Sequence, residues 1–94
     1  MANKTSKAEL WHKIGFIKIS SIRYQTIKTL GKDFMMPSEI AKKTGLKPSQ
    51  VSTALNDLKK EKLVVCMNEK TKKGRIYQNT KLALDIIKIL DESK

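Results

Sequence analysis

The sequence contains very few of the residues from which metal centres and disulfide bonds are built. Its 94 residues include one cysteine, Cys66, and one histidine, His12. A single cysteine cannot form an intrachain disulfide, and we expect a buried, inert thiol in a reducing cytoplasm. Two soft ligands are too few for a four-ligand zinc site within one chain. The composition therefore predicts no metal and no cofactor.

Features of enzymes and of membrane proteins are also missing. The chain has four glycines, and they form no glycine-rich phosphate loop. It shows no nucleophile or acid–base constellation, so we expect no catalytic residues and no small-molecule substrate. No apolar run approaches the roughly 20 residues of a membrane helix, and the polar start does not resemble a secretion signal. We expect a cytoplasmic protein that is not an enzyme and does not contact membranes.

Aromatic residues are scarce, and acidic residues are outnumbered. Only 5% of the chain is aromatic, too little for a surface that stacks single-stranded bases, so we expect Trp11 and Tyr77 in the core. Lys and Arg number 20 against 9 Asp and Glu, a net charge of +11. This positive field indicates a polyanionic partner. With 39% hydrophobic and 31% charged residues, residues 1–94 have the composition of one globular domain.

Start and stop signals of helices divide the chain into short elements. Residues 1–5 are polar and are expected to be flexible. Ser6 and Glu9 have the spacing of a capping box, and Gly31 and Gly45 stand where helices are expected to end. Two β-rich segments separated by a polar turn indicate a hairpin. The predicted elements are helices over residues 6–19, 21–30, 37–44, 48–61 and 81–91, a short strand over 34–36, and hairpin strands over 63–67 and 75–79.

The order of these elements predicts the architecture. Two helices joined by a short turn that contains Gly45 make a helix-turn-helix over residues 37–61. The hairpin that follows, residues 63–79, makes it the winged version of that motif. We therefore predict a mainly α fold with a small β-hairpin (α+β): a winged helix-turn-helix with extra N- and C-terminal helices.

The helix expected over residues 48–61 has one apolar and one polar face. Its apolar residues Val51, Leu55 and Leu58 are spaced for burial on one side. The opposite side carries hydroxyls and amides, where a helix kept only for solubility would more often carry Glu–Lys pairs, although an ordinary solvated face is the alternative. Asn and Gln can pair with adenine, and Ser or Thr can reach most bases. The candidate DNA-contacting residues of this helix are Ser49, Gln50, Ser52, Thr53, Asn56 and Lys60.

The predicted hairpin loop is strongly basic. From Glu69 to Arg75 it carries four cations and one carboxylate. Such a wing can lie along the phosphate backbone, and Arg75 could enter a narrow minor groove; a solvated charged turn is the alternative. Since Arg23 and Arg75 are the only arginines, we expect little readout of guanine. The cationic candidates for DNA contact are Lys47, Lys70, Lys72, Lys73 and Arg75.

The two terminal helices carry more apolar surface than one small core requires. The apolar arc of the helix over 81–91 is unusually wide, and the N-terminal helix adds a second stripe. We predict a homodimer that presents its two recognition helices to half-sites about 34 Å apart. The alternative is that the terminal helices pack on each other within a monomer. The predicted interface residues are Leu10, Trp11, Ile14, Ile17, Leu82, Ile86, Ile87, Ile89 and Leu90.

A series of short motifs follows in one order from residue 9 to residue 90. They are Leu10-Trp11 with Gly15-Phe16, Ser20 to Arg23 with Ile27 and Leu30, Pro37-Ser38-Glu39-Ile40-Ala41 with Thr44-Gly45-Leu46, Gln50-Val51-Ser52 with Leu55 and Leu58, Leu63-Val64, and Gly74-Arg75-Ile76-Tyr77 with Thr80. In order and spacing the sequence resembles the small archaeal winged-helix regulators related to the ArsR and MarR groups. That resemblance implies a dimeric, DNA-binding transcription factor. It places Gln50, Ser52, Thr53 and Asn56 on the recognition helix and Lys72, Lys73 and Arg75 on the wing.

Three features depart from the pattern of that family. Lys62 stands where the family usually has glycine, and a left-handed conformation there would cost about 1 kcal/mol. Ala83 replaces a common glycine, a change that favours helix. The cysteine clusters of metal-sensing relatives are missing, so metal regulation is not implied.

We therefore predict a sequence-specific regulator of transcription that binds double-stranded DNA as a homodimer. Lysines would neutralise phosphates while the polar helix face reads the major groove. Two alternatives stay open, because a fold does not determine a function. One is a protein-interaction subunit of a transcription or replication assembly, and the other is a sequence-neutral, chromatin-type DNA binder.

Overall fold

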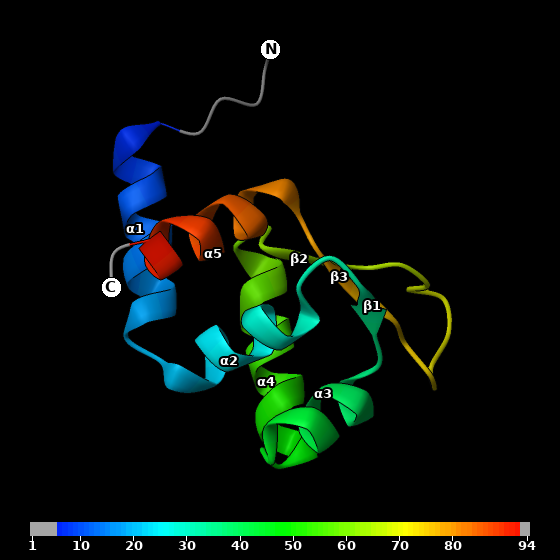
Figure 1. Ribbon diagram of the computed structural model, residues 1–94. Coiled ribbons are helices and arrows are strands. Elements are labelled where there is room, and N and C mark those ends of the chain that lie inside the picture. The colour runs from blue at the N-terminus through cyan, green and yellow to red at the C-terminus, as the bar shows by residue number, and fades with distance from the viewer. Residues whose placement is uncertain (1–5, 93–94) are drawn as a thin grey trace.

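The computed structural model describes residues 6–92, and the segment 1–5, expected to be flexible, lies outside these residues. Within them the chain forms five helices and one three-stranded antiparallel sheet (Figure 1). In chain order the elements are α1 (Lys7–Lys18), α2 (Ser21–Leu30), β1 (Phe34–Met35), α3 (Pro37–Thr44), α4 (Pro48–Lys60), β2 (Val64–Cys66), β3 (Tyr77–Asn79) and α5 (Lys81–Glu92). The predicted fold class, a winged helix-turn-helix with additional terminal helices, is confirmed.

Local capping interactions explain why the helices begin where the sequence predicted. The Ser6 hydroxyl accepts the Glu9 N–H at 3.1 Å, and the Glu9 carboxylate accepts the Ser6 N–H at 3.4 Å, which completes the capping box of α1. The Ser20 hydroxyl accepts the Arg23 N–H at 3.3 Å and begins α2 in the same way. These contacts supply partners for backbone donors that a helix start otherwise leaves unpaired.

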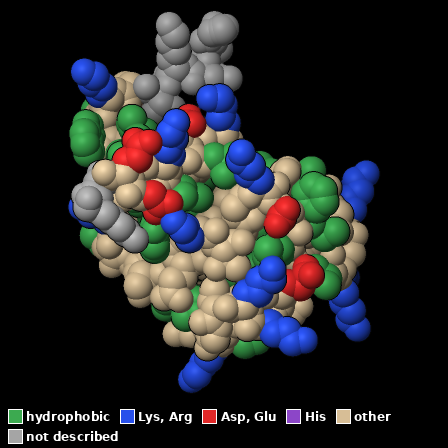
Figure 2. All heavy atoms as spheres, in the orientation of Figure 1, with side chains coloured by type: hydrophobic (Ala, Val, Ile, Leu, Met, Phe, Trp, Pro, Cys, Tyr) green, Lys and Arg blue, Asp and Glu red, His purple; other side chains and the backbone are tan. Residues whose placement is uncertain are grey.

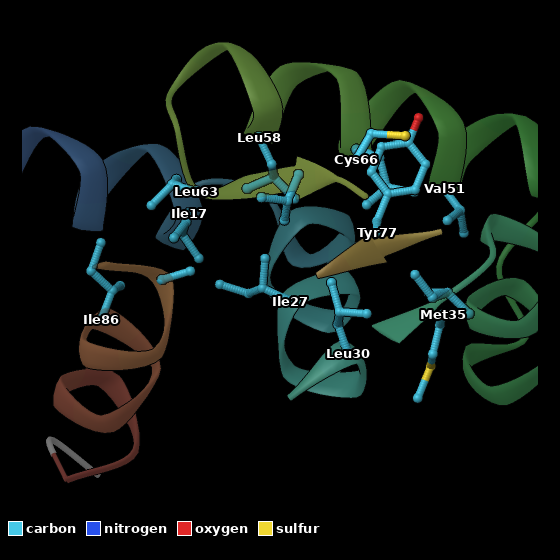
Figure 3. Packing of buried hydrophobic residues seen from close by; sticks show 14 of the residues in the cluster. Ile17, Ile27, Leu30, Met35, Val51, Leu58, Leu63, Cys66, Tyr77 and Ile86 are labelled. Carbon is cyan, nitrogen blue, oxygen red and sulfur yellow. The ribbon is translucent and has the colours of Figure 1, made fainter. Parts of the chain in front are cut away.

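The core is a single cluster to which α1, α2, α4, β2 and α5 all contribute side chains (Figure 3). Tyr77 belongs to it with 6% of its surface exposed, and Cys66 is buried as predicted. The prediction of a buried Trp11 is wrong, because 65% of that side chain is exposed. The buried side of α1 passes through Ile14 and Ile17, and Trp11 lies outside it, where no element of residues 6–92 covers the ring.

The sheet has the strand order β1–β3–β2, so the last strand in sequence lies in the centre. Met35, Tyr77 and Cys66 form one row across the sheet and point into the core, while Phe34, Gln78 and Val65 form the neighbouring row on the outer face. The hairpin strands are shorter than the predicted 63–67 and 75–79. One backbone hydrogen bond, from the Met67 N–H to the Ile76 carbonyl at 2.7 Å, extends the pairing, and beyond it side chains bind the backbone of the loop.

Asn79 connects the sheet to the end of α2. This residue is buried, and its Nδ2 donates hydrogen bonds to the carbonyl oxygens of Ile27 at 2.9 Å and Gly31 at 3.0 Å. The Ile27 carbonyl also accepts the Gly31 N–H at 3.0 Å, so the Asn79 amide adds a second donor to the C-terminal end of α2 from a strand that lies about fifty residues later. The hairpin is thereby held at a constant place on the helical core.

We predict that replacing Lys62 with glycine stabilises the protein. Lys62 has a φ of 61°, a left-handed conformation in which a side chain is strained. Lys62→Gly removes that strain, and the free energy of unfolding in urea is expected to rise by about 1 kcal/mol. Lys60→Gly, in the last turn of α4, is the control and should not raise the same quantity. An unchanged or lower stability of Lys62→Gly would contradict the prediction.

Candidate nucleic-acid interface

The turn between α3 and α4 is tightly hydrogen-bonded. Gly45 ends α3 in the left-handed conformation, with a φ of 78°, and its N–H donates to the carbonyl of Ala41 at 2.9 Å. The Thr44 hydroxyl donates to the Ile40 carbonyl at 2.8 Å and accepts the Leu46 N–H at 3.1 Å. Pro48 then takes the first position of α4, where its lack of an N–H has no cost. The start of α4 is therefore held in one orientation relative to α3.

The polar face of α4 is open to solvent, as the sequence predicted. Val51, Leu55 and Leu58 are buried, and Ala54 joins them. The exposed residues on the other side of the helix are Ser49, Ser52, Thr53, Asn56 and Lys60. Gln50 is half-buried, and its Oε1 accepts the Lys47 N–H at 2.9 Å. Gln50 therefore caps α4 with its carbonyl group, a role that its place three residues after Lys47 signals in the sequence.

A groove separates α4 from the hairpin. It has a volume of about 450 Å³, and it is open to solvent along the outer side of the helix-turn-helix. Its lining brings together two of the predicted residues of α4, Ser52 and Asn56, and two of the predicted wing residues, Lys72 and Arg75. The other residues that line this groove are Met36, Pro37, Ser38, Pro48, Gly74 and Tyr77. We call it the wing groove.

The remaining predicted residues of α4 lie on its other flank. Ser49, Gln50 and Thr53 border a second cleft of about 290 Å³, toward the start of α2. Arg23 and Asp57 lie in the wall of that cleft. The structure therefore divides the predicted polar face between two hollows, with α4 as the ridge between them.

The wing loop is braced by two of its own side chains. Asn68 accepts the Ile76 N–H at 2.7 Å through Oδ1 and donates from Nδ2 to the Gly74 carbonyl at 3.1 Å. Arg75 donates from Nε to the Thr71 carbonyl at 2.7 Å and contacts the Glu69 carbonyl at 3.4 Å. In the free protein the Arg75 guanidinium therefore binds the backbone of its own loop, and its entry into a minor groove stays a prediction.

One ion pair ties the wing to α4. Lys59 and Glu69 lie 2.8 Å apart. The hydrogen bond from Lys59 lowers the pKa of the Glu69 carboxyl, and the same contact raises the pKa of Lys59. The contribution of this ion pair to the stability of the fold is present above the ordinary pKa of glutamate. It is lost as the pH falls through the lowered pKa of Glu69. Lys70, Lys72 and Lys73 are exposed and form no ion pair with the residues from 6 to 92.

Two cations hold α4 from the side of α1 and α2. Lys13 donates to the Glu61 carbonyl at 2.9 Å and lies 3.0 Å from the Glu61 carboxylate, at the end of α4. Arg23 donates to the Phe16 carbonyl at 2.8 Å, stacks 3.8 Å from the centre of the Phe16 ring, and lies 3.6 Å from the Asp57 carboxylate. These half-buried contacts connect the N-terminal helices to the middle and the end of α4, and no local sequence signal predicts them, because the partners lie far apart in the chain.

In the structure, fewer of the predicted interface residues of the terminal helices are available to a second chain. Ile14, Ile17 and Ile86 are buried in the protein's own core, so these three side chains are unavailable to a second chain. Leu10, Leu82, Ile87, Ile89 and Leu90 are half-buried and pack at the edge of that core, while Trp11 is exposed. Helical periodicity identified apolar positions but could not separate those that face inward from those at the rim, because α5 is apolar over a wide arc.

Basic side chains are more numerous than acidic ones on the molecular surface. Figure 2 shows lysine and arginine side chains projecting around the edge of the molecule, with fewer acidic side chains between them.

Across residues 6–92, His, Cys, Asp and Glu side chains form no group of three or more that could hold a metal ion. Nor does this part of the chain contain a helix of the length and apolar character needed to cross a membrane.

Comparison with known proteins places the fold. No protein-family model matches the sequence, and no curated protein matches it significantly. TubR bound to 24 bp of tubC, from Bacillus thuringiensis serovar israelensis pBtoxis, is 12% identical with a TM-score of 0.78, over 98% of this chain and 100% of TubR.

Two further structures agree with this result. The homodimeric winged helix-turn-helix DNA-binding domain of Mb0332 from Mycobacterium bovis, a possible ArsR-family transcriptional regulator, is 18% identical with a TM-score of 0.72, over 99% of this chain and 89% of that one. A mutant of ZitR from Lactococcus lactis is 19% identical with a TM-score of 0.68, over 78% of this chain and 51% of ZitR. At such low identity these likenesses establish the winged helix-turn-helix fold.

We predict that Asn68 orders the wing. Asn68→Ala removes the acceptor of the Ile76 N–H, and hydrogen exchange of that amide should accelerate about fivefold to tenfold, the effect of losing one hydrogen bond in a local opening. Asn68→Asp keeps an acceptor at this position and should preserve the protection of Ile76. Equal exchange rates in Asn68→Ala and the unchanged protein would show that the loop is ordered by other contacts.

Proposed function

We propose that this protein binds double-stranded DNA and regulates transcription, without catalytic activity of its own. The observation that carries the proposal is that the exposed Ser52 hydroxyl and Asn56 amide of α4 share one open groove with the cationic wing. A polar helix face of this kind can read base edges, and unpaired lysines can neutralise phosphates. The net charge of +11 supports a polyanionic partner.

In the proposed complex, α4 enters the major groove and the wing follows the backbone. Ser52 and Asn56 would reach base edges from the side of the wing groove, and Ser49 and Thr53 from the opposite flank of α4. Lys47 and Lys60, at the two ends of α4, and Lys70, Lys72 and Lys73 of the wing would contact phosphates. Gln50 would have only its amide N–H groups to offer, since its carbonyl caps the helix.

We further propose that the protein acts as a homodimer. The exposed Trp11 and the half-buried apolar residues of α1 and α5 would form the contact between two copies. TubR, which is bound to 24 bp of tubC, and the homodimeric domain of Mb0332 support such an arrangement by likeness of fold. The proposed class is that of the ArsR/MarR-like regulators, acting in the cytoplasm, and an archaeal origin stays an expectation from the resemblance.

We predict that Asn56 and Lys72 contribute to DNA binding in different ways. After selection of bound sequences from a random duplex pool, Asn56→Ala should relax the preference at one base pair by about 1–3 kcal/mol. Lys72→Ala should weaken binding to all duplexes alike and reduce the slope of log affinity against log salt by about 1. Fluorescence anisotropy titrations at several salt concentrations measure both quantities.

The same titrations separate the alternatives. A sequence-neutral binder would show the salt dependence without an enriched motif in the pool, whereas a specific factor should prefer its site by about 10³-fold or more. A protein-interaction subunit would bind no duplex even at low salt. Affinity that does not change with salt would refute the proposed phosphate contacts.

We predict that Trp11→Glu dissociates the dimer. A charge placed on the exposed ring position of α1 would be desolvated in the interface, so the mass in solution should fall from two chains to one. Phe34→Glu is a matched control, because Phe34 is an aromatic residue of similar exposure on the outer face of the sheet. Analytical ultracentrifugation provides the measurement, and a dimer that survives Trp11→Glu would exclude this interface.

A further inference from the structure

Tyr77 combines a buried ring with a hydroxyl that has no partner. Only 6% of the residue is exposed, and it packs in the core beside Cys66. Figure 3 shows the ring between the sheet and α4, with its oxygen directed toward α4. Tyr77 lines the wing groove, and its hydroxyl makes no hydrogen bond with any residue from 6 to 92. Buried tyrosines usually find such a partner, so a hydroxyl left open toward a groove is an available donor.

The other groups around the wing groove have the chemistry of an anion site. Hydroxyls reach it from Ser38 and Ser52, and cations from Lys72 and Arg75. Ser38 occupies the second position of α3, where the helix dipole and free backbone N–H groups favour negative charge. None of the residues that line the groove is acidic. The nearest carboxylate on α3, that of Glu39, turns back to accept the Met36 N–H at 2.8 Å.

We propose that the wing groove binds one phosphate group. The Tyr77 hydroxyl donates a hydrogen bond to this phosphate, and Lys72 lies in the same groove. The inference rests on the proposed function, because the source of the phosphate would be the backbone of the bound duplex. The Tyr77 ring is buried in the core cluster, so its hydroxyl is already in position and loses little side-chain freedom on binding. A phosphate held at this point would set the distance from the backbone to Ser52 and Asn56, and so the depth of α4 in the major groove.

Tyr77→Phe tests the proposal, because it keeps the packed ring and removes the hydroxyl alone. On a mixed-sequence duplex of 24 bp, a hydrogen bond to a charged group should be worth about a tenfold loss of affinity. The slope of log affinity against log salt should stay unchanged, since a neutral hydroxyl releases no counterion. Lys72→Ala should change that slope, so the two variants are distinguishable.

Tyr24→Phe is the matched control for the loss of a tyrosine hydroxyl. The Tyr24 hydroxyl donates to the Asp91 carboxylate at 2.9 Å, in the contact between α2 and α5, and does not line the wing groove. This variant should bind the duplex as the unchanged protein does. Thermal unfolding of both variants shows whether their folds are retained. Duplex affinity of Tyr77→Phe equal to that of the unchanged protein would overturn the proposal.

A second arm separates the failure of this proposal from the failure of DNA binding. If the unchanged protein binds no duplex, inorganic pyrophosphate is titrated while the backbone amide resonances of Tyr77 and Lys72 are followed by NMR. Shifts that saturate in the unchanged protein and disappear in Tyr77→Phe would support binding of a free phosphate at the same site. Absence of both duplex binding and pyrophosphate shifts would overturn the proposed phosphate site together with the proposed function.

Discussion

The burial of one face of α4 is the constraint on which the candidate site depends. Val51, Leu55 and Leu58 pack in the core, and a helix keeps a constant angle between its faces. Once these three side chains are buried, Ser52 and Asn56 must point outward. Apolar packing therefore aims the polar face, and the contacts of Lys13 and Arg23 hold the helix in that orientation from behind.

Most of the acidic residues have structural roles, and these roles leave the excess of lysines at the surface. Asp57, Glu61, Glu69, Asp85 and Asp91 each pair with a cation, and Glu9 and Glu39 cap helices. Among the described residues, the lysines of the wing beyond Glu69 receive no carboxylate. Their mutual repulsion is unfavourable in a short loop, and the hydrogen bonds of Asn68 and Arg75 hold the loop together against it.

The sequence predicted the elements well because their signals are short-range. The Ser6–Glu9 box, the Ser20 cap and the glycines at positions 31 and 45 act within three or four residues, and the helices begin and end at or within a residue or two of the predicted limits. The prediction of burial was wrong where an element distant in the sequence would have been needed to cover the side chain. Trp11 has the apolar spacing of a core residue, but no element of residues 6–92 covers its ring.

By itself, the sequence determined the helix-turn-helix, the wing and the excess of positive charge, because each depends on composition or on neighbours along the chain. Only the tertiary structure decided which apolar residues of the terminal helices are left at the surface, and that Asn79 caps a helix about fifty residues away. It also decided that Tyr77, Ser38 and Lys72 share one groove. The physical reason is that packing joins residues remote in the chain, and no periodicity or local spacing encodes which of them will meet.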